Sequence, residues 1–79
     1  MLEKIKAILS KNLKIAPSEI TEKTNLRKDL DVDSLALVEI VMEIENTFGI
    51  GEISDDDIPK LKTVGDIVNY IEEQKKKNL

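Results

Sequence analysis

The 79-residue sequence contains no cysteine and no histidine. Disulfides and thiolate metal sites are therefore excluded, and the core has to rest on aliphatic packing. A serine nucleophile needs a neighbouring base, and imidazole, the usual base for that role, is absent. Phe48 and Tyr70 are the only aromatic residues. These absences argue against a self-contained hydrolase.

Long apolar runs are also missing. The longest covers residues 35–38, far below the length of a membrane span, and the amino terminus has no extended apolar signal region. We therefore expect no membrane span and a cytoplasmic location. The length predicts one domain over residues 1–79, too small for a substrate cavity with its own catalytic shell.

Charge is unevenly distributed along a chain whose formal net charge is −4. Before residue 29, seven basic residues stand against three glutamates. Residues 29–59, by contrast, contain no Lys or Arg and ten carboxylates: Asp29, Asp31, Asp33, Glu39, Glu43, Glu45, Glu52, Asp55, Asp56 and Asp57. The negative field of this acidic stretch disfavours nucleic acid and favours partners with basic surfaces.

Hydrophobic periodicity predicts a first amphipathic helix over residues 2–14, after which Pro17 prevents an easy continuation. Residues 16–30 lack a period and predict a long ordered loop, anchored to the core by Ile20, Leu26 and Leu30. A second helix is predicted over residues 34–48, with Gly49 as its C-terminal cap.

The second helix has two apolar faces when its residues are placed at 100° intervals. One face, with Leu37, Ile40, Val41, Ile44 and Phe48, suits the core. The other predicts an exposed apolar stripe of Leu35, Val38 and Met42, bordered by Glu39, Glu43 and Glu45. An apolar centre with an acidic rim resembles a docking surface for partners. The alternative is that neighbouring loops cover the stripe.

Two further helices are predicted. Ser54 can cap a short third helix, with Asp57 in the reciprocal capping position and Pro59 ending or kinking it. Thr63 can cap a fourth helix whose core stripe is Val64, Ile67, Val68 and Ile71, and whose last turn holds three lysines that then fray into solvent. The predicted fold class is all-α, a small four-helix bundle with a long first loop and a short third helix.

The tripeptide Asp33-Ser34-Leu35 places one hydroxyl in the first turn of the second helix, with Asp33 as its N-cap. Taken alone, such a tripeptide is usually only a capping pair. Here it is followed by Val38-Glu39-Ile40-Val41-Met42, and together the two segments resemble those of acyl carrier proteins. The resemblance covers nearly the whole chain.

The resemblance implies a non-catalytic carrier. In that family a 4′-phosphopantetheine arm, derived from coenzyme A, is attached by a phosphopantetheinyl transferase to the serine that corresponds to Ser34, flanked by Asp33 and Leu35. The arm holds acyl groups as thioesters and presents them to fatty acid synthesis enzymes and acyltransferases, and we expect a monomer. Alternatives are a carrier of polyketide, aminoacyl or D-alanyl cargo, and an acidic adaptor that carries no arm.

The spacing Asp29-x-Asp31-x-Asp33 superficially matches the start of an EF-hand calcium loop. Position six is Ser34 where glycine is needed, and position twelve is Ile40 where a bidentate glutamate is needed, so no specific metal site is predicted. A looser hypothesis is weak divalent-cation binding by charge screening at these three aspartates, and at Glu52 and residues 55–57.

The sequence departs from the commonest bacterial fatty-acid carrier pattern at two positions beside Ser34. Ala36 stands where Asp is frequent, and Asp31 stands where Gly is usual. Both departures bear on which transferase recognises the chain.

Overall fold

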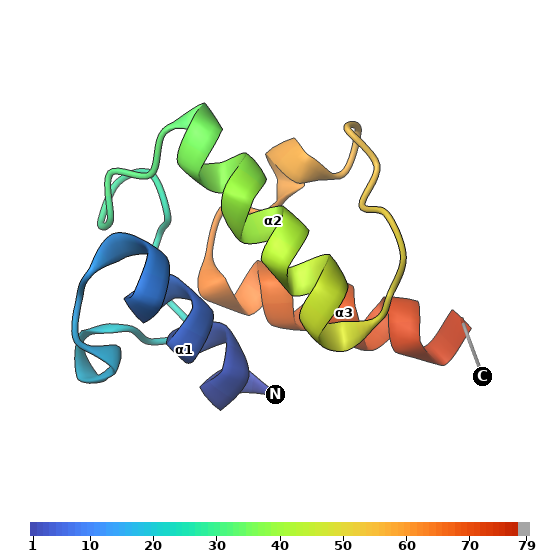
Figure 1. Ribbon diagram of the computed structural model, residues 1–79, viewed down its shortest axis with the longest axis horizontal. Helices are drawn as coiled ribbons and strands as arrows, with labels where there is room; N and C mark the ends of the chain where they lie inside the picture. Colours follow the sequence, from blue (N-terminus) through green and yellow to red (C-terminus); the bar gives the residue numbers. More distant parts are fainter. Residues whose placement is uncertain (78–79) are drawn as a thin grey trace.

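The computed structural model describes residues 1–77, which fold into three α-helices and two short 3₁₀ segments. The chain runs through α1 (Leu2–Leu13), η1 (Pro17–Glu19), α2 (Ser34–Phe48), η2 (Ile58–Lys60) and α3 (Val64–Lys77). Figure 1 shows α1 beside α2, with a long connection between them and the C-terminal end of α3 on the opposite side from α1. Residues 78 and 79 of the predicted domain lie outside this description.

All three α-helices contribute to one hydrophobic core. Its side chains are aliphatic, as the scarcity of aromatic residues requires, and Phe48 and Tyr70 only pack against its edge. The fully buried members come from α1 (Ile5, Leu9), the long loop (Ile20, Leu26), α2 (Ile40, Ile44) and α3 (Val64, Ile67, Ile71). Burial of these side chains is the main force that holds the helices together.

The ends of α1 and α2 follow the predictions closely. Helix α1 stops at Leu13 because Lys14 adopts a left-handed conformation, with φ 57°. Helix α2 begins at Ser34 and is closed by Gly49, whose φ of 62° suits glycine and whose N–H donates to the Glu45 carbonyl at 3.0 Å. The predicted second helix is therefore confirmed at both ends.

The predicted third helix is shorter than a normal α-helix. The N–H groups of Asp57 and Ile58 both donate to the Ser54 carbonyl, at 2.9 and 3.1 Å, and the chain then passes into η2. Pro59 lies within η2 and has no N–H with which to extend a helical ladder. The predicted capping box is wrong, because the Ser54 hydroxyl accepts from Asp56 N, at 3.1 Å, rather than from Asp57.

Helix α3 starts with a reciprocal cap. The Asp66 N–H donates to Thr63 Oγ1 at 3.1 Å, and the Thr63 N–H donates to Asp66 Oδ2 at 3.1 Å. Thr63 was predicted as the cap, whereas the return contact from Asp66 was not. The three lysines predicted to fray lie in the last turn of α3, within its helical bounds.

The long loop is fastened to the start of α3 by backbone hydrogen bonds. Val64 N donates to the Thr24 carbonyl at 3.0 Å, and Gly65 N donates to the Glu22 carbonyl at 2.8 Å. Gly65 suits this close approach, because an added Cβ would stand 3.1 Å from that Glu22 oxygen, a tight contact that would require a small shift of the backbone. These bonds satisfy donors that a helix N-terminus leaves unpaired, and they fix the segment that leads to α2.

Candidate functional site

Ser34 is the first residue of α2 and is exposed. Asp33 is the N-cap, and its Oδ1 accepts a hydrogen bond from Ala36 N at 2.8 Å. The predicted cap is thus confirmed. Within residues 1–77 no side chain hydrogen-bonds to the Ser34 hydroxyl. The hydroxyl is therefore presented outward at the positive end of the helix dipole.

The approach to Ser34 is rigidly anchored. Val32 is buried, and its N–H donates to the Leu26 carbonyl at 2.9 Å, while Leu26 N donates to the Lys62 carbonyl at 2.9 Å. Asp31 adopts a left-handed conformation with φ 53°. Glycine takes this conformation without strain and aspartate tolerates it, which explains how an aspartate stands where the family pattern has glycine.

A cavity of about 310 Å³ lies beside Ser34. It brings together three parts of the chain: the long loop, the first turns of α2, and the segment around η2. Its lining residues are Arg27, Ser34, Leu37, Val38, Asp55, Ile58 and Pro59. Sequence reasoning did not find the contributions of Arg27, Asp55 and Pro59, because no local pattern indicates that these segments meet at Ser34.

A second cavity of about 550 Å³ continues along α2. It shares Val38, Asp55 and Ile58 with the first cavity and extends to Met42, Glu45 and Ile53. Its outer wall is the loop between α2 and η2, which Figure 1 shows arching away from the helices. The space beside Ser34 is therefore not isolated but runs along one side of α2.

The apolar stripe on α2 is exposed as predicted. The exposed fractions are 71% for Leu35, 45% for Val38 and 56% for Met42, and the neighbouring loops do not cover them. Opposite them, Leu37, Ile40, Val41 and Ile44 are buried and Phe48 is half-buried. Glu39 is exposed beside the stripe. An unpartnered apolar surface of this kind suits a docking role.

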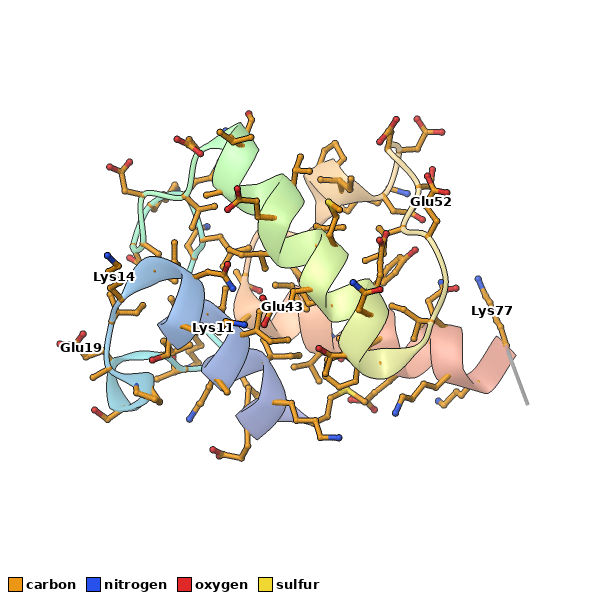
Figure 2. The ribbon with its side chains drawn as sticks, in the orientation of Figure 1. Lys11, Lys14, Glu19, Glu43, Glu52 and Lys77 are labelled. Atoms are coloured by element: carbon orange, nitrogen blue, oxygen red, sulfur yellow. The ribbon has the colours of Figure 1, made fainter. Side chains whose placement is uncertain are left out.

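Two of the glutamates predicted to border the stripe make contacts within the domain instead. Glu43 faces α1, where its carboxylate accepts from Asn12 Nδ2 at 3.2 Å and lies 3.4 Å from Lys11 Nζ (Figure 2). Glu45 is half-buried, and its Oε2 accepts from Ile53 N at 2.6 Å. Both carboxylates therefore make contacts within the domain that a helical wheel cannot predict.

The aspartates before Ser34 do not form a metal-binding group. Among the described residues, no three carboxylates lie close enough together to hold a metal ion. Asp29 Oδ2 accepts from Asn25 N at 2.7 Å, and the Asp33 carboxylate is occupied by its capping bond. Screening of the acidic stretch by divalent cations stays a prediction.

A small helical domain that exposes a serine at a capped helix start has the features of a carrier domain. Residues 3–71 match the family model described as "Phosphopantetheine attachment site". A hydroxyl free of internal hydrogen bonds, beside a cavity with an arginine on its wall, fits a phosphodiester-linked arm.

Similar proteins narrow the class further. The chain is 46% identical over 71 residues to the acyl carrier protein of Lactobacillus acidophilus, covering 90% of this chain and 88% of that one. It is 45% identical over 74 residues to the acyl carrier protein of Thermotoga maritima, covering 94% and 90%. A solved structure of acyl carrier protein from Enterococcus faecalis superposes with a TM-score of 0.75 at 41% identity, covering 89% of this chain and 87% of that one.

The chain therefore belongs to the acyl carrier protein family. It is a non-catalytic carrier whose covalently attached 4′-phosphopantetheine holds acyl groups, and the predicted family and cofactor are confirmed. None of the helices within residues 1–77 is long and apolar enough to cross a membrane.

Proposed function

We propose that Ser34 Oγ is the attachment atom, that a phosphopantetheinyl transferase loads it from coenzyme A, and that the carried acyl groups are intermediates of fatty acid synthesis. The observation that carries this proposal is the position of Ser34, exposed at the capped start of α2 and on the wall of a cavity. The proposal treats residues 1–79 as a single carrier domain that acts as a monomer. A cytoplasmic location stays a prediction, to be tested by cell fractionation.

The chain's own contribution at this site is to present and accommodate the arm. The first N–H groups of α2 and the helix dipole favour the negative charge of a phosphodiester. Because no described side chain hydrogen-bonds to the Ser34 hydroxyl, the transferase has to supply the base that deprotonates it. The two adjoining cavities along α2 offer a carried acyl chain a partly sheltered place.

We propose that partners dock on the apolar stripe of Leu35, Val38 and Met42. Flexible Met42 suits a surface that must fit several enzymes in turn. Exposed Glu39 supplies negative charge beside the stripe, which complements basic patches on the transferase, the synthesis enzymes and the acyltransferases. In this proposal Glu43 and Glu45 act mainly by holding the docking helix in place.

Intact mass spectrometry tests the attachment site. The protein is incubated with coenzyme A, Mg²⁺ and a phosphopantetheinyl transferase, alongside Ser34→Ala and a matched control, Ser54→Ala, which removes another exposed serine near the same cavities. We expect wild type and Ser54→Ala to gain one phosphopantetheine and Ser34→Ala to gain none. Modification of Ser34→Ala, or no gain by wild type with several transferases, would overturn the proposal.

The same samples separate the alternatives. An adaptor that carries no arm would keep its partner binding in Ser34→Ala and would gain no mass as wild type. A carrier of another cargo would be loaded, and the mass of the group bound to protein isolated from its own cells would identify a polyketide, aminoacyl or D-alanyl group rather than a fatty acyl chain.

A further inference from the structure

Among the described residues, Arg27 is the only basic one on the wall of the cavity that contains Ser34. The other ionisable residue on that wall is Asp55, and the chain around Ser34 carries Asp31 and Asp33. All the charged side chains in residues 29–59 are acidic. Arg27 lies outside this stretch and brings a positive charge close to Ser34. Its location is a product of the fold, since six residues separate it from Ser34 in the sequence.

The backbone of Arg27 is held in place. Its N–H donates to Asn25 Oδ1 at 3.0 Å, in a turn that Asn25 also closes through Lys28 N at 2.9 Å. The preceding residue, Leu26, is buried in the core. A long side chain that starts from so fixed a point samples a limited volume, and part of that volume borders the cavity.

The guanidinium of Arg27 forms no ion pair with the described residues of the domain. Over residues 1–77, the ion pairs within 4.0 Å are Lys11 with Glu43 and Lys60 with Asp57. Arg27 is thus an exposed cation, on a cavity wall beside a serine, with no carboxylate of the described chain bound to it. Such a group is available to an anion that arrives on that serine.

We propose that Arg27 is a positioning residue for the arm, pairing with the phosphodiester on Ser34; this inference rests on the proposed attachment at Ser34. A phosphodiester adds a negative charge that the start of α2 favours but that the carboxylates of Asp31, Asp33 and Asp55 repel. An arginine fork offers two parallel donors to phosphate oxygens and offsets that repulsion. This pairing holds the phosphate end of the arm at the opening of the cavity.

A thermodynamic cycle tests the pairing. Melting temperatures of the unmodified and the modified forms are measured for wild type, Arg27→Gln and Lys28→Gln. Lys28 is the matched control, because it is exposed in the same turn, carries the same charge and does not line the cavity. Taking the difference between the two forms of each variant cancels any direct effect of a substitution on folding.

We expect the modified-minus-unmodified difference to fall by roughly 4 °C in Arg27→Gln relative to wild type and to stay unchanged in Lys28→Gln. The ³¹P resonance of the phosphodiester should also shift in Arg27→Gln and not in Lys28→Gln. Equal differences and equal ³¹P shifts in all three proteins would overturn the pairing while attachment at Ser34 stood. Modification of Ser34→Ala, or no modification, would overturn the attachment and the pairing together.

Discussion

The carboxylate of Glu45, on α2, accepts a hydrogen bond at 2.6 Å from the backbone N–H of Ile53, in the loop that follows the helix. Ile53 is buried, and both residues line the larger cavity. The loop between them turns through two residues in the left-handed region, Gly49 and Gly51. Glu45 therefore determines how the wall of that cavity lies against α2.

Glu45→Ala should lower the free energy of unfolding by about 1–3 kcal/mol, the usual cost of removing a charged partner from a half-buried donor. The matched control is Glu39→Ala, which removes an exposed carboxylate from the same helix and should change stability by no more than about 0.5 kcal/mol. Urea unfolding followed by circular dichroism measures both. Equal midpoints for the two variants would show that the Ile53 contact contributes little.

Helix positions and the exposed stripe could be predicted from the sequence because they follow from local periodicity and capping chemistry. Asp33 and Gly49 identify the ends of α2, and the two apolar faces of that helix predicted which side chains would be exposed. The prediction failed where a polar group has a distant partner. Neither the contact of Glu45 with Ile53 nor that of Glu43 with α1 has a signature in a helical wheel.

The surroundings of Ser34 show the same limit. Its hydroxyl could be placed at a helix start from the sequence alone, but the cavity beside it also includes residues more than twenty positions away, such as Asp55 and Pro59. The short third helix was predicted from Ser54 and Pro59, yet Pro59 reduces it to a single 3₁₀ turn. Tertiary contacts, which have no local pattern, decide the lining of the cavity, whereas Pro59 limits the length of the third helix.

Loss of the α2 cap should weaken the helix start that presents Ser34. Asp33→Ala removes the acceptor for Ala36 N and should cost about 0.5–2 kcal/mol of stability. Asp33→Asn keeps an acceptor oxygen at the same place and should recover most of that loss. Urea midpoints for the two variants make the comparison, and an Asn variant as unstable as the Ala variant would indicate that charge rather than capping matters here.

Truncating a side chain of the exposed stripe should weaken the binding of partners and leave the stability of the fold nearly unchanged. Met42→Ala should weaken transferase binding by roughly tenfold, about 1.4 kcal/mol, while changing the unfolding free energy by no more than about 0.5 kcal/mol. Met42 is 56% exposed, so little buried area is lost. Surface plasmon resonance measures the affinity for the transferase, and urea unfolding measures the stability. The control is Lys76→Ala, which changes an exposed side chain on α3 and should leave binding unchanged.

Divalent cations should stabilise the domain by weak association with its acidic stretch rather than by filling a defined site. Residues 29–59 carry ten carboxylates, but no three carboxylates among the described residues converge on a metal position. We therefore expect millimolar Mg²⁺ to raise the melting temperature smoothly, without saturation, and slightly more than NaCl at matched ionic strength. An identical rise in NaCl would rule out weak Mg²⁺ binding, and saturation at micromolar Mg²⁺ would instead demand a specific site.

Tyr70 should make stability depend on pH in the alkaline range. Its hydroxyl donates to Asp57 Oδ2 at 3.2 Å. Burial, followed by that hydrogen bond and the negative charges of Asp57 and Glu45, raises the pKa of Tyr70 above its ordinary value of 10.0. Above about pH 10 the folded state therefore binds more protons at Tyr70 than the unfolded state does, and stability falls as pH rises.

Wild type should accordingly keep the full contribution of Tyr70 below about pH 10 and lose it as pH rises through the higher pKa of the folded state. Tyr70→Phe removes both the hydrogen bond and the titration. All other ionisable groups are common to both proteins, so the difference between the two urea-unfolding profiles isolates Tyr70. We expect that difference to be largest near neutral pH and to shrink at alkaline pH, because ionised Tyr70 no longer donates to Asp57. A difference that is constant across the range would mean that ionisation of Tyr70 is not coupled to folding.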